Sequence, residues 1–483
     1  MKNRAISRRL TPVWFPALAV LAIGALIGIS PAAGRAAEYE SVEIKDVPHV
    51  VQKPDFCGEA CAAMYLSKLG RDLDQDFVFD QSGLDPKLGR GCYTKELHQA
   101  LRNIGFRTGA GGYTVNSKRA EREMEAQFAA LHGDLLAGVP SIICMHYDDQ
   151  PNTTEHFRLI LGYDAQTDEV LYHEPALAEG GYQRMKREQL IKLWPLKYKP
   201  TRWTVIRLRL EPGRLIEGES SETFTGADYA THLHELKKRL PSKDFHIVLQ
   251  PPFVVVGDQS AAMVRKHARR TVKWTVDHIK QQYFAKDPHE IIDIWLFKNK
   301  ESYEKHNWQL FRHRPTTPYG YYSSTNKVLV MNIATGGGTL VHEIVHPFME
   351  ANFEDCPSWF NEGLASLYEQ SSEKQGRIWG LTNWRLRGLQ QAIAAARVPS
   401  FRTLCGTSTE EFYGEDPGTN YSQARYLCYY LQEQGLLEKY FHQFRRDAKD
   451  DPTGYVTLKE ILGERDMVAF QKRWEKYVTK LRF

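Results

Sequence analysis

Two histidines and one glutamate in the C-terminal half have the spacing of a metal-dependent hydrolytic site. From His342 to His346 the sequence reads HEIVH. In a helix, residues four apart lie on the same face, so the two histidines can bind a single ion. Glu343 then lies beside that ion, where a carboxylate can act as a general base. The pattern therefore predicts a zinc-dependent hydrolytic centre.

A third ligand follows on a second predicted helix. Glu362 lies sixteen residues after His346, in a helix expected to open at Pro357, because proline is favoured in the first helical turn. Two histidines and one glutamate leave a fourth position open, which is typical of catalytic rather than structural zinc. Glu369 is expected to share the face of Glu362 and to accept a hydrogen bond from a ligand histidine. The predicted set is Zn²⁺ bound by His342, His346 and Glu362.

The alternative is a buried helix whose histidines coincide with the pattern by chance. Apolar side chains surround the motif on most sides; they are Ile344, Val345, Phe348 and Met349. Histidine and glutamate side chains among them would be costly to bury unpaired, and a metal ion pairs them. We therefore favour the zinc interpretation, with Thr339 as the expected N-terminal cap of the helix.

The helix pair resembles that of the gluzincin metallopeptidases, whose third ligand is a glutamate on a following helix. The resemblance covers about residues 226–483. It implies hydrolysis of peptide bonds, with Val328–Ile333 as the edge strand along which an extended substrate binds. It also implies a tyrosine or histidine that stabilises the oxyanion. Tyr421, at the start of an expected helix, is our candidate, and a tyrosine that only packs there is the alternative.

Two features of the C-terminal half depart from this family's pattern. The interval between His346 and Glu362 is shorter than in the large aminopeptidases, so the resemblance does not extend to that activity. Pro347 follows the second histidine directly, and its missing N–H and its ring should kink the helix there. The turn that contains the ligands precedes this kink and should stay intact.

A second candidate centre surrounds Cys57, which lies five residues after Gln52. A cysteine at the start of a helix has its thiolate favoured by exposed N–H groups and by the helix dipole. Gln52 can donate a hydrogen bond to an oxyanion. His156, at the start of a predicted strand, is the natural base, and Glu174 on the paired strand can orient it.

This order of residues resembles the papain-like cysteine peptidases, specifically the type that processes bacteriocin leader peptides. The resemblance covers about residues 45–210. Gln52 lies one residue closer to the cysteine than is usual in that family, and Glu174 stands where an aspartate is typical. Cleavage at Cys57 and peptide or partner binding without cleavage both remain open. A disulfide between Cys57 and Cys61, one helical turn apart, is geometrically poor, but another cysteine could be the partner.

The length and composition indicate a two-domain globular protein. The chain has 483 residues, of which 42% are hydrophobic and 25% charged, and this length exceeds one ordinary core. A small sheet followed by a helical body gives the C-terminal half an α+β order. We expect a papain-like domain over residues 37–211, a linker over 212–225 and a gluzincin-like metallopeptidase domain over 226–483. The linker stretch is rich in Gly, Ser and Glu.

The first 36 residues are expected to form a signal peptide. Basic residues precede an apolar run from Pro12 to Ile29, and small residues follow as far as Ala37. This order is typical of a secretory signal, so we expect export to the periplasm or the extracellular space. The run approaches spanning length, so an uncleaved membrane anchor is the alternative, and it would be the chain's contact with the membrane.

The net charge and the number of cysteines limit which classes of partner and which thiol chemistry we expect. A net charge of +4, from 63 basic and 59 acidic residues spread along the chain, argues against nucleic-acid binding. We expect a peptide or protein substrate, and the oligomeric state does not follow from the sequence. Seven cysteines in an exported chain suggest one free reactive thiol. A bridge from Cys356 to Cys405 or Cys428 is a further hypothesis.

Overall fold

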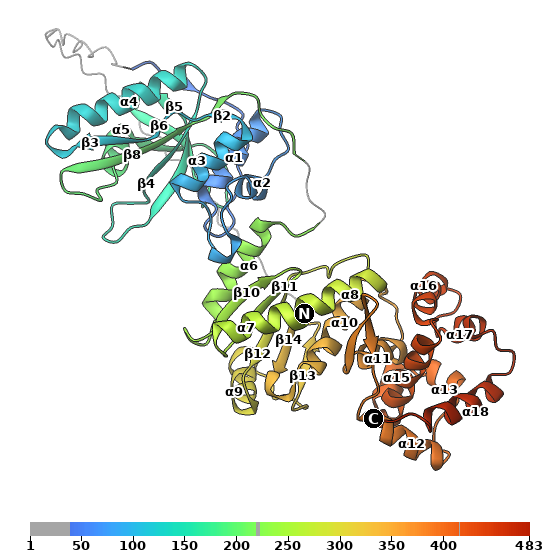
Figure 1. Ribbon diagram of the computed structural model, residues 1–483. Coiled ribbons are helices and arrows are strands. Elements are labelled where there is room, and N and C mark those ends of the chain that lie inside the picture. Colours follow the sequence, from blue (N-terminus) through green and yellow to red (C-terminus); the bar gives the residue numbers. More distant parts are fainter. Residues whose placement is uncertain (1–38, 219–222, 415) are drawn as a thin grey trace, which may run out of the picture.

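The computed structural model describes residues 39–218, 223–414 and 416–483 (Figure 1). The predicted signal peptide lies outside these residues, and so does the 219–222 stretch of the predicted linker. Within them, no helix is long and apolar enough to cross a membrane. Two sheets, each with its own helices, follow one another along the chain. We call the elements up to residue 218 the N-terminal domain and those from residue 223 the C-terminal domain.

An antiparallel sheet forms the centre of the N-terminal domain. Its strand order is β3-β8-β4-β5-β6-β7, and β1 pairs with β5. The strands are β1 (Val42–Glu43), β3 (Gly111–Asn116), β4 (Ser141–His146), β5 (Glu155–Asp164), β6 (Glu169–His173), β7 (Gln183–Lys186) and β8 (Arg202–Arg209). Strands β4 and β5 are buried along most of their length. Helices must therefore cover both faces of the sheet.

Two groups of helices cover those faces, as the alternation of side chains along β4 requires. Ile142 and Cys144 of β4 belong to the core formed with α1, α2 and α3, whereas Ile143 and Met145 belong to the core formed with α4 and α5. The helices are α1 (Cys57–Lys68), α2 (Gln75–Asp80), α3 (Thr94–Ile104), α4 (Ala120–Leu136) and α5 (Arg187–Leu193).

A five-stranded mixed sheet begins the C-terminal domain, in the order β10-β11-β12-β14-β13. The strands are β10 (His246–Gln250), β11 (Phe253–Gly257), β12 (Ile292–Phe297), β13 (Gly320–Ser323) and β14 (Val328–Asn332). Strands β11, β12 and β14 are parallel, and β10 and β13 pair with them antiparallel at the two edges. The prediction that Val328–Ile333 is an edge strand was therefore wrong, because β14 lies between β12 and β13.

Helices also cover both faces of this second sheet. Side chains of α6 (Gly226–Arg239) and α9 (Lys300–Phe311) pack on one face. On the other face lie α7 (Ala261–His267), a π-helical turn (Ala268–Lys273), α8 (Trp274–Gln282) and α10 (Gly338–Asn352). The long helix from α7 to α8 runs across the sheet toward the helical body (Figure 1).

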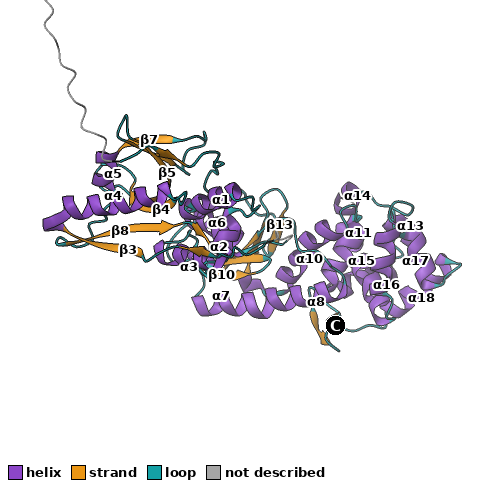
Figure 2. Cartoon of the chain, turned by 90° about the horizontal axis from the view of Figure 1, so that it is seen from above, coloured by secondary structure: helices purple, strands orange, loops and turns teal. Residues whose placement is uncertain are grey.

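A helical body completes the chain, at the end of the molecule away from the first sheet (Figure 2). It contains α11 (Ser358–Leu367), α12 (Arg385–Ala394), α13 (Phe401–Cys405), α14 (Thr409–Gly414), α15 (Pro417–Glu433), α16 (Leu437–Asp447), α17 (Tyr455–Leu462) and α18 (Met467–Val478). A short hairpin, β15 (Ser371–Lys374) and β16 (Arg377–Gly380), interrupts the helices. The sequence did not predict this hairpin. The cysteines are all free, so the proposed bridges from Cys356 are absent from the described chain.

The described part of the expected linker packs on the N-terminal domain as far as residue 216. β9 (Glu211–Pro212) pairs with β2 (Phe106–Arg107), and Ile216 N–H donates to the carbonyl of Ile104 at 2.9 Å. Helix α6 then lies between the two domains. Its Ala227 and Ala230 belong to the core of the N-terminal domain.

Candidate functional site

The HEIVH motif lies on α10, as the pattern predicted. The helix begins at Gly338, and its N-cap residue Gly337 makes no side-chain cap, so the prediction of a Thr339 cap was wrong. A Cβ at Gly338 would lie 2.2 Å from the carbonyl oxygen of Glu369, so the helix starts against another backbone segment. Pro347 lies inside the helix, which continues beyond it to Asn352.

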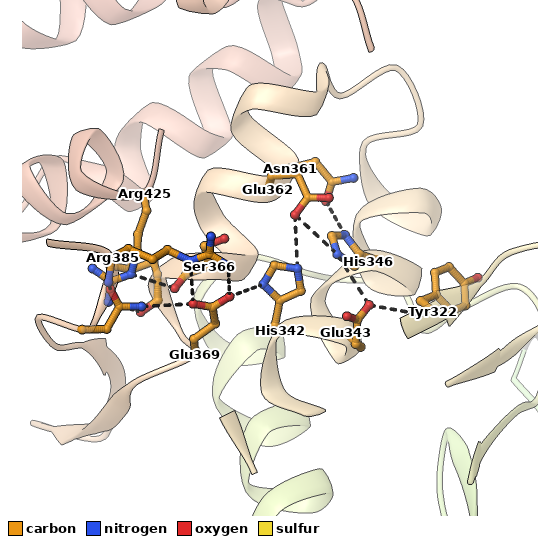
Figure 3. A network of polar contacts seen from close by, with 12 residues as sticks. Tyr322, His342, Glu343, His346, Asn361, Glu362, Ser366, Glu369, Arg385 and Arg425 are labelled. Carbon is orange, nitrogen blue, oxygen red and sulfur yellow. Dashed lines mark hydrogen bonds and ion pairs between the residues drawn. The ribbon is translucent and has the colours of Figure 1, made fainter. Parts of the chain in front are cut away.

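Four side chains of the predicted metal site converge (Figure 3). One potential ligand atom from each of His342, Glu343 and His346 lies within 4.8 Å of the others. Oε2 of Glu362, on α11, lies 3.1 Å from Nε2 of His342 and 4.0 Å from Nε2 of His346. This buried oxygen forms ion pairs with the two histidines but no hydrogen bond in the described chain. The arrangement fits a cation held between the three side chains.

The other ring nitrogens of both histidines face oxygen acceptors. Nδ1 of His346 lies 3.0 Å from Oδ1 of Asn361, and Nδ1 of His342 lies 3.3 Å from Oε1 of Glu369. Each contact orients its ring so that Nε2 is the nitrogen that faces Glu362. Glu369 reaches His342 although α11 ends at Leu367, so it does not share a helical face with Glu362.

Arginine side chains hold the carboxylate of Glu369 and the C-terminal end of α11. Arg385 donates to both oxygens of Glu369, at 2.8 and 3.0 Å. Arg425, on α15, is fully buried, and its Nε donates to the carbonyl of Ser366 at 2.9 Å. Its Nη2 donates to the carbonyl of Leu367 at 3.3 Å. The C-terminal end of α11 is thereby fixed against α15.

The charges of this cluster follow from its contacts. Burial alone would raise the pKa of Glu362, but the charge of His346 and the contact with His342 outweigh it and hold the pKa at about 2. The pKa of Glu369 is likewise held at about 2 against burial, by His342 and Arg385. Burial raises the pKa of Glu343, partly offset by the two histidines. A raised pKa makes Glu343 a stronger base than an exposed carboxylate.

Two tyrosines lie beside Glu362. The hydroxyl of Tyr413 donates to Oε1 of Glu362 at 2.6 Å. Tyr421, the predicted oxyanion residue, has its ring centroid 6.1 Å from that of Tyr413. It lies in the second turn of α15, which begins at Pro417. Burial raises the pKa of both hydroxyls, so they stay protonated donors at neutral pH. Sequence reasoning missed Tyr413, because no spacing relates it to the motif.

A cavity of about 740 Å³ opens over the site. It is lined by Thr317, Tyr319, Gly320, Thr335, Gly336, Gly337, Gly338, Thr339, His342, Glu343, Glu369, Gln370, Asn383, Trp384, Arg385 and Tyr421. The edge strand β13 borders it, and Tyr322 N–H of that strand donates to Oε2 of Glu343 at 3.0 Å. Glu343 is thus anchored to the sheet edge while it faces the two histidines.

In the N-terminal domain, Cys57 is the first residue of α1, and its side chain is half-buried. Burial raises the pKa of the Cys57 thiol to about 12. The N–H groups of Phe157 and Gly58 lower it and the charge of Glu59 raises it, but both effects are smaller. The prediction that the helix start favours the thiolate was therefore wrong in its net effect, because desolvation outweighs the helix dipole.

The structure brings His156 and Glu174 together. Nε2 of His156 lies 2.5 Å from Oε1 of Glu174, and Nε of Arg158 donates to Oε2 of Glu174 at 2.6 Å. Burial alone would raise the pKa of Glu174, but the hydrogen bond from His156 and the charges of His156 and Arg158 hold it below its usual range. No hydrogen bond joins His156 to Cys57 within the described chain, although Phe157, the next residue, contacts the thiol.

Gln52 is tied to the same corner of the domain through its backbone. Its N–H donates to the carbonyl of Pro175 at 2.9 Å, directly after Glu174. Its side-chain Oε1 is buried without a hydrogen-bond partner in the described residues. Sequence reasoning missed Glu59, a fully buried carboxyl whose Oε1 accepts from Cys92 N–H at 2.6 Å. The sequence signal that could have identified Glu59 is a charged residue among the small and apolar residues at the start of α1.

A comparison with known protein families matches the N-terminal domain. Residues 44–201 match the model of the Peptidase_C39 like family. This confirms the predicted papain-like, cysteine-peptidase type of domain in the N-terminal part of the chain. The matched segment lies wholly within that domain. No curated protein matches the chain.

Two solved structures are similar to parts of the chain. One is a double glycine motif protease from an AMS/PCAT transporter in complex with its leader peptide. It is 15% identical, with a TM-score of 0.22, and the match covers 35% of this chain and 99% of that one. The other is xylellain, a cysteine protease from Xylella fastidiosa. It is 13% identical, with a TM-score of 0.25, and the match covers 36% of this chain and 86% of that one.

Alkylation of Cys57 should accelerate about tenfold per pH unit between pH 7 and pH 10. The thiolate is the nucleophile, and a pKa of about 12 means that its fraction is still rising throughout this range. Labelling with iodoacetamide and mass spectrometry of the Cys57 peptide measure the rate. A rate that is already constant from pH 7 upward would show a stabilised thiolate and contradict the effect of burial.

Gly338→Ala should lower the free energy of unfolding by about 1–3 kcal/mol, because the added Cβ meets the Glu369 carbonyl. Gly388→Ala is the matched control, since a Cβ at this exposed position of α12 meets nothing within 4 Å. It should leave stability unchanged or raise it by up to about 1 kcal/mol, as alanine does in helices. Denaturant unfolding compares the two, and equal effects would refute the close approach at Gly338.

Proposed function

We propose that this protein is a peptide or protein hydrolase whose C-terminal domain works with one Zn²⁺ bound by His342, His346 and Glu362. The observation that carries the proposal is the buried Oε2 of Glu362, which faces both Nε2 atoms at 3.1 and 4.0 Å without a hydrogen-bond partner in the described chain. Burying a carboxylate oxygen without a hydrogen bond costs free energy, and a bound cation removes that cost. Two imidazoles and one carboxylate are the ligand set of a catalytic zinc ion.

The surrounding residues have distinct roles in this proposal. Bound Zn²⁺ would supply Lewis-acid polarisation of the peptide carbonyl and of water. Glu343 accepts the proton of the attacking water and passes it to the leaving amine, while Tyr322 N–H holds its Oε2. The hydroxyl of Tyr421 donates to the developing oxyanion. Tyr413 fixes the carboxylate of Glu362.

The substrate of this site is an extended peptide segment. Strand β13 is the outer strand of its sheet and borders the cavity through Gly320. An outer strand presents backbone groups that can pair with another extended chain. A volume of about 740 Å³ accommodates several peptide side chains at once.

The N-terminal domain supplies a second candidate centre. In it, Cys57 is the nucleophile, His156 the base, Glu174 the residue that orients His156, and Gln52 the oxyanion donor. Binding of a peptide without cleavage is the competing function of this domain. The raised pKa of the Cys57 thiol favours it, and Arg158 binds the second oxygen of Glu174. The two functions differ in whether cleavage depends on Cys57.

Export remains part of the proposal and rests on the sequence of residues 1–36. Basic, apolar and small residues follow one another there in the order of a secretory signal. The mature chain would then begin at residue 37 and work in the periplasm or outside the cell.

In the Cys57→Ala background, Glu343→Gln should reduce cleavage of a diverse peptide mixture by at least about a hundredfold, because the amide cannot accept the proton. Glu354→Gln, an exposed position beyond the end of α10, is the matched control and should cleave normally. Mass spectrometry of the digest, with the protein starting at residue 37, measures both. Full cleavage by the Glu343 variant would refute the zinc-site proposal.

Cys57→Ala is tested in the same digest, together with a zinc chelator. Cleavage that persists in chelator and disappears in Cys57→Ala would establish a working thiol centre. Cleavage unchanged in Cys57→Ala and abolished by chelator would leave the N-terminal domain with a binding role.

A further inference from the structure

Helix α6 of the C-terminal domain contacts the segment that precedes the thiol. This segment, residues 52–56, which we call the thiol loop, leads directly into α1 at Cys57. Nζ of Lys53 lies 3.7 Å from Oδ1 of Asp228, and Nδ1 of His234 lies 3.4 Å from Oδ2 of Asp55. Asp228 and His234 both belong to α6. Two of the five residues of the thiol loop thus contact a polar side chain of the next domain.

Helix α6 also contacts a second segment, residues 88–91, which packs on the thiol loop. Lys237 Nζ donates to the carbonyl of Leu88 at 2.6 Å, and Nδ1 of His234 lies 3.3 Å from the carbonyl oxygen of Gly89. A Cβ at Gly91 would lie 1.9 Å from the carbonyl oxygen of Asp55, so this segment and the thiol loop are in direct contact. Helix α6 therefore fixes the thiol loop directly and through its neighbour.

The opposite face of α6 is joined to the second sheet. Leu233 and Leu236 belong to the core that this sheet forms with α9. Nε2 of His232 lies 2.7 Å from Oδ1 of Asp293, a buried residue of β12. A helix fixed in this way to the central strands cannot shift without disturbing that core.

The thiol loop has a backbone that needs outside support. Asp55 has φ +64°, a left-handed conformation that is uncommon for a residue other than glycine. Within its own domain, the loop is held by α2: the side chain of Gln75 bonds Lys53 N–H at 2.8 Å and the Val51 carbonyl at 3.0 Å, and Asp76 pairs with Nζ of Lys53. These bonds fix the start of the loop, whereas α6 supplies the partner of Asp55, two residues before the thiol.

We propose that α6 is a positioning element of the thiol site, so that access to Cys57 depends on the C-terminal domain. Asp228 and His234 are its positioning residues, which act on Cys57 through Lys53 and Asp55. The N-terminal domain is then not an autonomous module, because part of the support of its thiol loop comes from the neighbouring domain. The inference concerns the thiol site of the proposed function, but it does not require that this site cleaves peptides.

The test is the alkylation rate of Cys57 in the full chain at pH 9, followed by mass spectrometry of its peptide. In the double variant Asp228→Ala, His234→Ala the rate should rise at least about threefold, because loss of the Lys53–Asp228 ion pair and of the contact between His234 and Asp55 permits local opening of the loop. Lys238→Ala is the matched control, since this α6 residue pairs with Glu235, at 2.8 Å, and with no other acidic side chain among the described residues. Its Cys57 should react as in the parent chain.

Two further readouts separate positioning from general destabilisation. The pair Asp228→Glu, His234→Gln keeps groups that can bond Lys53 and Asp55, and it should restore the slow rate. Cys356, a half-buried cysteine of the C-terminal domain, should react equally in all variants. An unchanged Cys57 rate in the double alanine variant would overturn the proposal. So would an equal rise at Cys356 or in Lys238→Ala. Peptide cleavage enters none of these measurements, so the result is independent of whether either centre is catalytic.

Discussion

The close packing of α10 against α11 is the constraint on which the C-terminal site depends. It forces the buried Oε2 of Glu362 against the Nε2 atoms of His342 and His346, where no hydrogen bond satisfies it in the described chain. Gly338 allows the start of α10 to reach the backbone of Glu369, which orients His342 in turn. Two histidines and one carboxylate positioned in this way are suited to bind a divalent cation.

The support for this arrangement extends into the helical body. The fully buried Arg425 donates to the carbonyls of Ser366 and Leu367 and so ties the end of α11 to α15, while Arg385 holds Glu369 (Figure 3). Removing one member of a buried charged pair lowers stability by more than the pair contributes, because the remaining charge is left buried without a partner. The helical body therefore contributes residues that hold the site in place.

The two candidate centres differ in how burial affects them. At the C-terminal site, histidines close to Glu362 overcome desolvation and keep the carboxylate charged. At Cys57, desolvation outweighs the backbone N–H groups that lower the pKa, and it raises the thiol pKa to about 12. His156 makes its short contact with Glu174 rather than with the thiol. The N-terminal domain thus combines the paired His156 and Glu174 with a Cys57 thiol that is protonated at neutral pH.

Local features of both domains could be predicted from the sequence. The bounds of α3 and α4 follow from helical periodicity, and the grouping of His342, His346 and Glu362 follows from the spacing within and between two helices. Strand β13 and the β15–β16 hairpin were not predicted, because each strand has only four residues. Short strands of this length carry too little alternation to be recognised.

Features that depend on contacts between residues far apart in the sequence could not be predicted from the sequence. Tyr413 reaches Glu362 across 51 positions, and α6 reaches the thiol loop from the other domain. The expected activation of Cys57 relied on the local helix dipole, which tertiary burial outweighs. The placement of β14 inside the sheet depends on β13, which precedes it in the chain and pairs outside it.

The zinc content of the purified chain tests the central claim most directly. After incubation with zinc and dialysis, mass spectrometry of the metal should find one ion per chain in the parent protein. The double variant His342→Ala, His346→Ala should retain almost none, while His313→Ala, an exposed histidine outside the cluster, should retain one. Equal zinc in all three proteins, or none in the parent chain, would contradict a metal site at His342, His346 and Glu362.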